Sequence, residues 1–278
     1  MWIVSIFDGK GNILPSYEYL RCSFVQRMND SAFFEVLPVV PVDKDLKNGQ
    51  PEKDEFGAIV RGDAAQKNIY LIFTAHEFDD GYQTIKEVLL DRQLKASFFV
   101  TGQYAEQNRD KIHDLVKDGH YIGPHSHDHL LYADWETRKT LVSRKKFKRD
   151  LQKNLRQLQK AGVDHPVRIF MPPYEWYNHD IVNWSAEMGL QVVDFTYGIR
   201  TAADYTYPEM QEKYVTSEEI LRGVYEREEK EGLNGYIILV HLGTDPRRSD
   251  KLYNHLDGLI RYLSEKGYQF CRIDRLEE

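Results

Sequence analysis

Four ionisable side chains stand together in the stretch FTAHEFDDGY: His76, Glu77, Asp79 and Asp80. They come directly behind the apolar run YLIF, which has the composition of a buried strand. Adjacent aspartates alone are a weak signal, since they often form a turn or a helix cap. Carboxylates beside a histidine at a strand end are also the groups that metal and acid–base chemistry use.

A second group of such residues is the run HSHDH, residues 125–129, which holds three of the ten histidines of the chain. His125 and His129 are four residues apart, so a helical turn after Pro124 would present both imidazoles to one point. This spacing favours a metal site over surface histidines.

The two groups complement each other chemically. Catalytic zinc sites use three protein ligands and leave one position for water. Two histidines therefore need one more ligand, and the aspartate pair can supply it while keeping a second carboxylate free as a base.

Composition limits the remaining possibilities. The chain has 278 residues, 41% of them hydrophobic and 29% charged, which is typical of a soluble globular protein. The net charge is −7, and the basic run RKKFKR (144–149) lies in a helical pattern, so a nucleic-acid partner is not expected. Cys22 and Cys271 have no metal or redox spacing.

No apolar run approaches the ~20 residues that span a bilayer. The N-terminal stretch MWIVSIFDGK breaks with Asp8 and Gly9 before a signal-peptide core forms. We expect no membrane insertion. The location stays open between the cytoplasm and, for a trimmed chain, an extracytoplasmic site, and the oligomeric state is equally open.

From Tyr70 onward, seven short apolar runs alternate with amphipathic helical stretches. This alternation predicts parallel strands joined by right-handed crossovers. Seven such units favour a closed or nearly closed barrel, so the predicted fold is α/β, a distorted (β/α)7 barrel. The seven strand candidates are residues 70–75, 96–100, 121–123, 167–171, 190–195, 236–240 and 268–273.

Residues 1–66 differ from the rest, with short β-type runs broken by polar turns. We predict a small antiparallel β region of unknown role there, followed by a catalytic barrel over residues 67–278.

In such a barrel the residues just after each strand share one face. One end of the barrel, its mouth, would therefore bring together four groups of residues. These are the ionisable residues 76–80, the three histidines of residues 125–129, the stretch PPYEWYN and His241. Loops are polar everywhere, but they seldom collect three histidines and set carboxylates opposite them.

These residues resemble the polysaccharide deacetylases, the carbohydrate esterase group that includes chitin, chitooligosaccharide and peptidoglycan deacetylases and some acetylxylan esterases. The likeness runs from about Tyr70 to the C-terminus. EFDDG is similar to the first motif and implies Asp79 as general base and Asp80 as metal ligand. HSHDH matches the second motif and implies His125 and His129 as the other ligands of one divalent ion, most simply Zn²⁺.

Later motifs of the family match in part. LVH, Leu239 to His241, resembles the fifth motif and implies His241 as general acid and Leu239 as part of the acetyl pocket. The third motif matches in MPPYEWYN, where Tyr174 would offer its backbone N–H to the oxyanion. Pro173, Trp176 and Tyr177 are the expected substrate contacts, with Trp176 and Tyr177 equally open to a core role.

Two departures qualify the likeness. Met171 stands where the family has the arginine that orients the base, and Glu175 replaces a glycine. The fourth motif is not recognisable, so Asp194 or the pair Asp204-Tyr205 would have to orient His241. His76 and Glu77 are substitute bases if Asp79 points away.

The resemblance implies metal-dependent removal of acetyl groups, N-acetyl first, from an oligo- or polysaccharide. Two alternatives stay open: an O-acetyl esterase of the xylan type, and a carbohydrate-binding protein that has lost catalysis.

Overall fold

The computed structural model describes residues 49–276, and the β-type runs expected within residues 1–48 lie outside the described residues. All seven expected strands of the barrel are present. Their bounds are Asn68–Ala75 (β3), Ser97–Val100 (β4), Tyr121–Pro124 (β5), Ile169–Phe170 (β6), Gln191–Val192 (β7), Ile237–His241 (β8) and Gln269–Cys271 (β9).

Parallel pairing joins these strands into a distorted (β/α)7 barrel. One sheet runs in the order β5-β4-β3-β8, with β9 added beside β3, and β6 pairs with β7. Single backbone hydrogen bonds connect the two parts: Met171 N–H donates to Pro124 O (3.3 Å), and Thr196 N–H donates to Ile237 O (2.9 Å). The short strands β6 and β7 are therefore the weakly paired side of the ring.

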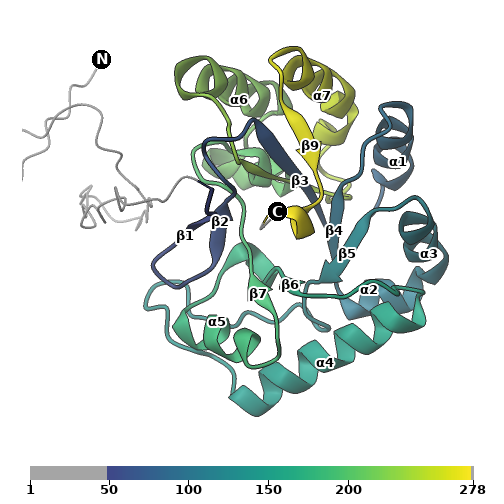
Figure 1. Cartoon of the computed structure of the whole chain (residues 1–278), viewed down its shortest axis with the longest axis vertical. Helices are drawn as coiled ribbons and strands as arrows, with labels where there is room; N and C mark the ends of the chain where they lie inside the picture. Colours follow the sequence, from purple (N-terminus) through teal and green to yellow (C-terminus); the bar gives the residue numbers. More distant parts are fainter. Residues whose placement is uncertain (1–48, 277–278) are drawn as a thin grey trace, which may run out of the picture. The chain divides into compact units, whose positions relative to one another are not determined.

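Helices surround the strands as an outer ring (Figure 1). Four of the predicted helices are followed by a glycine with φ between 73° and 94°, at positions 119, 162, 232 and 267, which is the usual way to end a helix. The helices are Tyr82–Asp91 (α1), Gly102–Gln107 (α2), Arg109–Lys117 (α3), Arg144–Lys160 (α4), His179–Ala186 (α5), Ser217–Glu231 (α6) and Leu256–Glu265 (α7).

Short 3₁₀ turns complete the connections between these elements. Their bounds are Pro173–Glu175 (η1), Thr201–Tyr205 (η2), Pro208–Lys213 (η3), Leu252–His255 (η4) and Ile273–Arg275 (η5).

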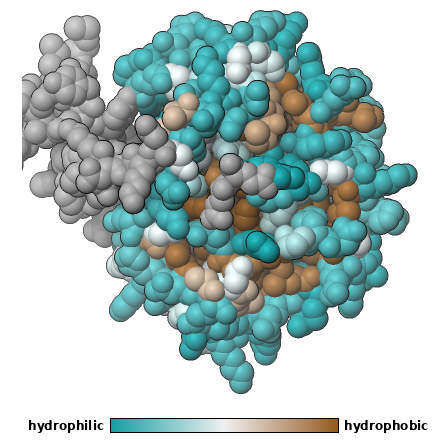
Figure 2. Space-filling view, in the orientation of Figure 1, coloured by the Kyte–Doolittle hydropathy of each residue, from teal (hydrophilic) through white to brown (hydrophobic). Residues whose placement is uncertain are grey.

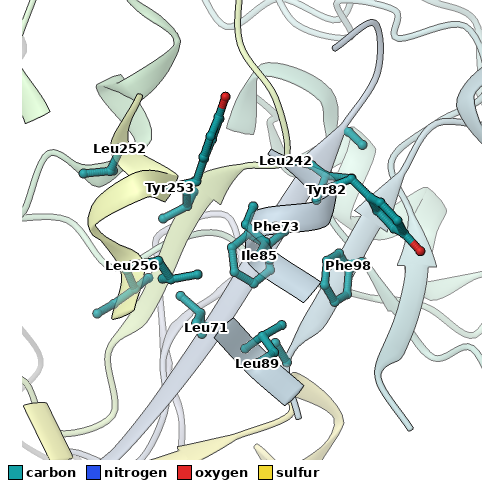
Figure 3. Packing of buried hydrophobic residues seen from close by; sticks show 14 of the residues in the cluster. Leu71, Phe73, Tyr82, Ile85, Leu89, Phe98, Leu242, Leu252, Tyr253 and Leu256 are labelled. Carbon is teal, nitrogen blue, oxygen red and sulfur yellow. The ribbon is translucent and has the colours of Figure 1, made fainter. Parts of the chain in front are cut away.

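The strands bury apolar side chains on both faces, as expected for a parallel sheet. Outside the barrel, Leu71 and Phe73 of β3 pack with side chains of α1 and α7 in the cluster drawn in Figure 3. Inside it, Ile72, Phe99 and Leu239 belong to a separate cluster that fills the interior. This second cluster forms the apolar floor beneath the mouth.

The register of the strands decides which residues reach the mouth. Ala75 pairs with Val100, and Val100 pairs with Pro124. The residues that follow, His76, Thr101 and His125, therefore leave the sheet at the same level. Thr74 pairs with His241, which puts His241 two residues below them, on the same face of the sheet.

Residues 52–61 form a small antiparallel pair, Glu52–Lys53 (β1) with Ile59–Arg61 (β2). This pair lies between α5 and α6 in the ring of Figure 1, and Asp194 N–H donates to Ile59 O (2.9 Å). The pair thus packs onto the barrel wall beside β7.

The distribution of hydrophilic and hydrophobic residues on the surface follows this layout. On the face seen in Figure 2, hydrophilic residues cover the outer helices and hydrophobic residues gather toward the middle. Within residues 49–276 no helix has the length and apolar character needed to cross a membrane.

Gly243, just after β8, should be intolerant of a side chain. A Cβ there would lie 2.3 Å from Asp79 N, a backbone atom that cannot give way cheaply. We expect Gly243→Ala to lower the free energy of unfolding by about 1–3 kcal/mol, the usual cost of overpacking. Urea denaturation would measure the change.

Gly258→Ala is the matched control, because that glycine lies in α7 and a Cβ added there would have no neighbouring atom within 4 Å. It should raise stability by up to about 1 kcal/mol through helix propensity. Equal stability of the two variants would contradict the packing assigned to Gly243.

Candidate active site

The loop after β5 carries His125 and His129 and is pinned from behind by α4. His125 N–H donates to Asn154 Oδ1 (3.1 Å), and the N–H groups of residues 127 and 128 donate to the Asp150 carboxylate (2.9 and 3.1 Å). Asp150 and Asn154 are buried polar residues four apart in α4. Together with Gln157 they interrupt the buried apolar stripe of Phe147, Leu151 and Leu158, and this interruption is the signal by which the sequence could have identified them.

The two histidine rings come together without the helical turn expected from their spacing. Ser126 and His129 instead adopt left-handed backbone conformations, with φ of 65° and 51°. The ring centroids of His125 and His129 are 5.1 Å apart. His127 points elsewhere: it is buried, and its ring packs against Gly102, where a Cβ would lie 2.0 Å from Nδ1.

The ring of His125 is held in one orientation. Its Nδ1 lies 2.8 Å from Met171 O, so Nδ1 is the protonated nitrogen and Nε2 keeps its lone pair. Burial lowers the pKa of His125 to about 3 and the pKa of His129 to about 2. Both imidazoles are therefore neutral, the form that binds a metal.

Met171, which replaces the expected arginine, contributes its carbonyl rather than its side chain. The side chain is fully buried in the interior cluster with Leu239. An arginine would have to bury its charge there. Leu239, expected in an acetyl pocket, is likewise fully buried, two residues before His241 on the same strand face.

His76 joins the histidine pair. Its ring stacks on that of His129 with a centroid distance of 4.4 Å and an interplanar angle of 6°. Its Nδ1 lies 3.3 Å from Thr101 Oγ1. Burial lowers the pKa of His76, so this third imidazole is neutral as well.

Asp79 lies beside His76 on the wall of an open polar hollow of about 420 Å³. Its carboxylate pairs with Lys111 of α3 and accepts a hydrogen bond from Tyr104 OH (2.8 Å). Lys111 is thus a cation paired with Asp79, whereas Met171 supplies none. The hollow is lined by His76, Glu77, Asp79, Gln103, Tyr104, Gln107 and Asn108.

Asp80 is not brought to the histidines. Its carboxylate accepts hydrogen bonds from Thr244 N–H (2.8 Å) and Tyr253 OH (2.6 Å) and pairs with Lys251 (2.8 Å). Among the described residues, no three His, Cys, Asp or Glu side chains are arranged to hold a metal ion as they stand. The expected set of Asp80, His125 and His129 is therefore not assembled.

His241 is oriented by Asp204. Its Nδ1 lies 2.5 Å from Asp204 Oδ1, and its backbone N–H donates to Oδ2 (2.9 Å). Burial alone would lower the pKa of His241, but the Asp204 carboxylate outweighs it and the pKa is raised. Asp194, the other candidate, is buried and accepts from Tyr177 OH and Tyr197 OH instead.

The third motif forms a strained turn above the buried Pro173. Tyr174 and Glu175 have φ of 61° and 53°, a conformation that favours glycine. The Tyr174 ring meets the His129 ring in an edge-to-face contact with a centroid distance of 4.5 Å. Burial raises the pKa of Glu175 to about 7, and its charge interacts with His241.

The aromatic side chains exposed at the site differ from the substrate contacts expected from the sequence, Trp176 and Tyr177. Tyr177 is buried, and its hydroxyl donates to Asp54 and Asp194. One face of the Trp176 ring is covered by the Arg138 guanidinium, 3.1 Å from the ring centroid. Exposed rings at the site include instead those of Tyr174 (44%) and Trp135 (52%), 5.6 Å apart, and that of Tyr205 (49%), 5.9 Å from the His241 ring. No motif in the sequence pointed to Trp135.

Histidines and carboxylates at the carboxyl ends of the strands of a parallel barrel occupy the position at which enzymes of the α/β-barrel class place their active sites. The family model described as polysaccharide deacetylase matches residues 61–193, which include these first strands and both histidines. Over this stretch the chain is similar to the polysaccharide deacetylase family.

Characterised relatives match most of the chain. The peptidoglycan-N-acetylmuramic acid deacetylase PdaA of Bacillus subtilis is 24% identical over 268 residues, covering 92% of this chain and 93% of its own. The chitooligosaccharide deacetylase of Sinorhizobium fredii is 25% identical over 228 residues, covering 77% and 94%.

Solved structures share the fold. A CE4 family pseudoenzyme from Bacillus anthracis aligns with a TM-score of 0.63 at 23% identity, covering 80% of this chain and 69% of its own. The Bacillus subtilis PdaA structure aligns with a TM-score of 0.62 at 22% identity, covering 82% and 92%.

The His241–Asp204 contact predicts a pKa change. Because the Asp204 carboxylate stabilises the protonated imidazole, Asp204→Asn should lower the pKa of His241. NMR titration of the His241 ring would measure it. Asp257→Asn, which removes an exposed carboxylate paired with Arg92, should leave that pKa unchanged. An unchanged pKa in Asp204→Asn would contradict the assignment.

Proposed function

We propose that this protein is a metal-dependent deacetylase that hydrolyses N-acetyl groups of an oligo- or polysaccharide. The observation that carries the proposal is the convergence of oriented imidazoles at one mouth. His125 is fixed by Met171 O and His241 is fixed by Asp204, each through Nδ1. Their Nε2 atoms are thereby left for a ligand and for a substrate.

The histidines fit a divalent ion such as Zn²⁺. Neutral imidazoles are zinc ligands, and a backbone carbonyl bound to the other ring nitrogen is the usual support of a metal-binding histidine. His125 and His129 would hold the ion. When bound, it would polarise the acetyl carbonyl and make its bound water more acidic.

Asp79 is the proposed base. Its carboxylate lines the same hollow as His76, and Lys111 with Tyr104 fixes it in place. It would take a proton from the attacking water as the oxygen adds to the acetyl carbon. Lys111 thus performs the positioning that the family assigns to the arginine replaced by Met171.

His241 is the proposed acid. Its raised pKa keeps the ring protonated to higher pH than an ordinary histidine, so it can give a proton to the departing sugar nitrogen. The carbon–nitrogen bond breaks, and acetate and a free amine are released. The Tyr174 backbone N–H is our proposed donor to the oxyanion, because this strained turn lies against His129.

The exposed aromatic rings at the site and the names of the relatives support an acetylated glycan as the substrate. Exposed Trp135 and Tyr174 beside His129 are suited to stacking on a sugar ring. The relatives' names cite deacetylation of peptidoglycan sugars and chitooligosaccharides, all N-acetylated. An O-acetyl glycan is the second candidate, since the same groups would serve an ester.

Acetate release tests the proposal. Zinc-loaded protein should release acetate from N-acetylated oligosaccharides or peptidoglycan fragments, and a chelator should abolish it. Asp79→Asn should keep its fold and lose about 10²–10⁴-fold in kcat, the usual contribution of a general base. The control is Asp114→Asn, which removes an exposed carboxylate paired with Lys86.

Either of two results would contradict this proposal. Unaltered turnover in Asp79→Asn would remove Asp79 from the mechanism. No acetate from any N- or O-acetylated glycan, with binding of those glycans retained, would favour a carbohydrate-binding protein.

Trp135→Ala tests the sugar-stacking surface. Loss of one stacking ring should raise KM for an oligosaccharide about 5- to 10-fold, equivalent to about 1 kcal/mol. The effect on kcat should be smaller, because the ring does not touch the reacting groups. Leu141→Ala, at an exposed apolar position in the same connection, is the control. An unchanged KM would exclude stacking on Trp135.

A further inference from the structure

We propose that His76 is the third protein ligand of the metal, in place of Asp80. The resulting site is a three-histidine site, His76, His125 and His129, with no carboxylate ligand. This inference rests on the proposed function, because it concerns the metal of the same site.

The strand register favours His76. It follows Ala75 at the level where His125 follows Pro124, and both strands are tied through Val100. Asp80 comes four residues later, after the chain has turned away from the sheet. A side chain directly at the strand end points over the mouth, whereas Asp80 reaches the segment beyond β8.

The spacing of the rings fits neighbouring ligands of one ion. With zinc–nitrogen distances of about 2.0–2.1 Å, two imidazoles on adjacent tetrahedral positions have centroids about 5 Å apart. The observed centroid distances are 4.4 Å between His76 and His129 and 5.1 Å between His125 and His129.

One ring has to turn before all three nitrogens meet. An imidazole lone pair lies in the ring plane, and the planes of His76 and His129 are nearly parallel, so they share no ligand point as they stand. The polar contacts of His76 are long: Nδ1 lies 3.3 Å from Thr101 Oγ1, and Nε2 lies 3.9 Å from Glu77 Oε1. A ring rotation would give up these two weak contacts and the stack on His129, which is a small change.

Asp80 would need a much larger change. It would have to leave Thr244 N–H, Tyr253 OH and the Lys251 ammonium together. Burial alone would raise the pKa of Asp80, but these three groups together outweigh it, so the pKa is lowered and the carboxylate stays charged. We therefore assign Asp80 to anchoring residues 244–253 against the turn before α1.

Zinc binding, not turnover, is the test. Isothermal titration and metal analysis of dialysed protein should show one Zn²⁺ per wild-type chain. Loss of a residue that only supports a ligand costs about 10- to 100-fold in metal affinity, so His76→Ala should raise the Kd by at least that much. Asp80→Asn and His113→Ala, the latter an exposed histidine on α3, should keep wild-type affinity.

Circular dichroism would verify that each variant is folded. Wild-type affinity in His76→Ala, loss of zinc from folded Asp80→Asn, or no zinc bound by the wild type would each overturn the proposal. X-ray absorption of the zinc-loaded wild type gives a test that needs no variant: three imidazoles support it, and two imidazoles with a protein carboxylate contradict it. If the variants bind zinc as expected here but the zinc-loaded wild type releases no acetate, the proposed function is refuted and the three-histidine site is not.

Discussion

The parallel register of β3 with β4 and β8 is the constraint on which the rest of the structure depends. It aligns Ala75 with Val100 and Thr74 with His241, and β5 continues the alignment through Pro124. Because side chains alternate along a strand, a shift of one residue would exchange the interior cluster for the outer one. It would also turn His241 away from the mouth.

The second requirement is a rigid support for loops that carry strained residues. Ser126, His129, Tyr174 and Glu175 are all non-glycine residues with left-handed backbone conformations, and all four lie at the mouth. Such conformations cost about 1–3 kcal/mol each and persist only where surrounding contacts enforce them. Asp150 and Asn154 provide these contacts for the first loop by binding its N–H groups from α4. Besides covering the barrel, α4 is thus part of the site's support.

The elements were predictable from the sequence because their signals are local. Apolar runs identified all seven strands, the amphipathic stretches between them indicated helices, and strand-end position identified His125 and His241. What could not be predicted depends on side-chain direction after the strand. Asp79 and Asp80 look like one pair, yet one turns to Lys111 on α3 and the other to residues 244–253. The choice of Asp204 over Asp194 likewise depends on which loop returns beside β8.

Departures from the family motifs therefore have to be judged in space rather than in sequence. The family includes proteins described as deacetylases and a fold neighbour described as a pseudoenzyme, at similar identity to this chain, so the fold alone does not decide between catalysis and its loss. Met171 removes a cation from one strand, but Lys111 brings another to the same carboxylate from a helix. Asp80 leaves the mouth, but His76 stands beside His129. If the proposed roles of Lys111 and His76 hold, each missing group has a neighbour of suitable chemistry, which is the pattern expected when a site is rebuilt rather than abandoned.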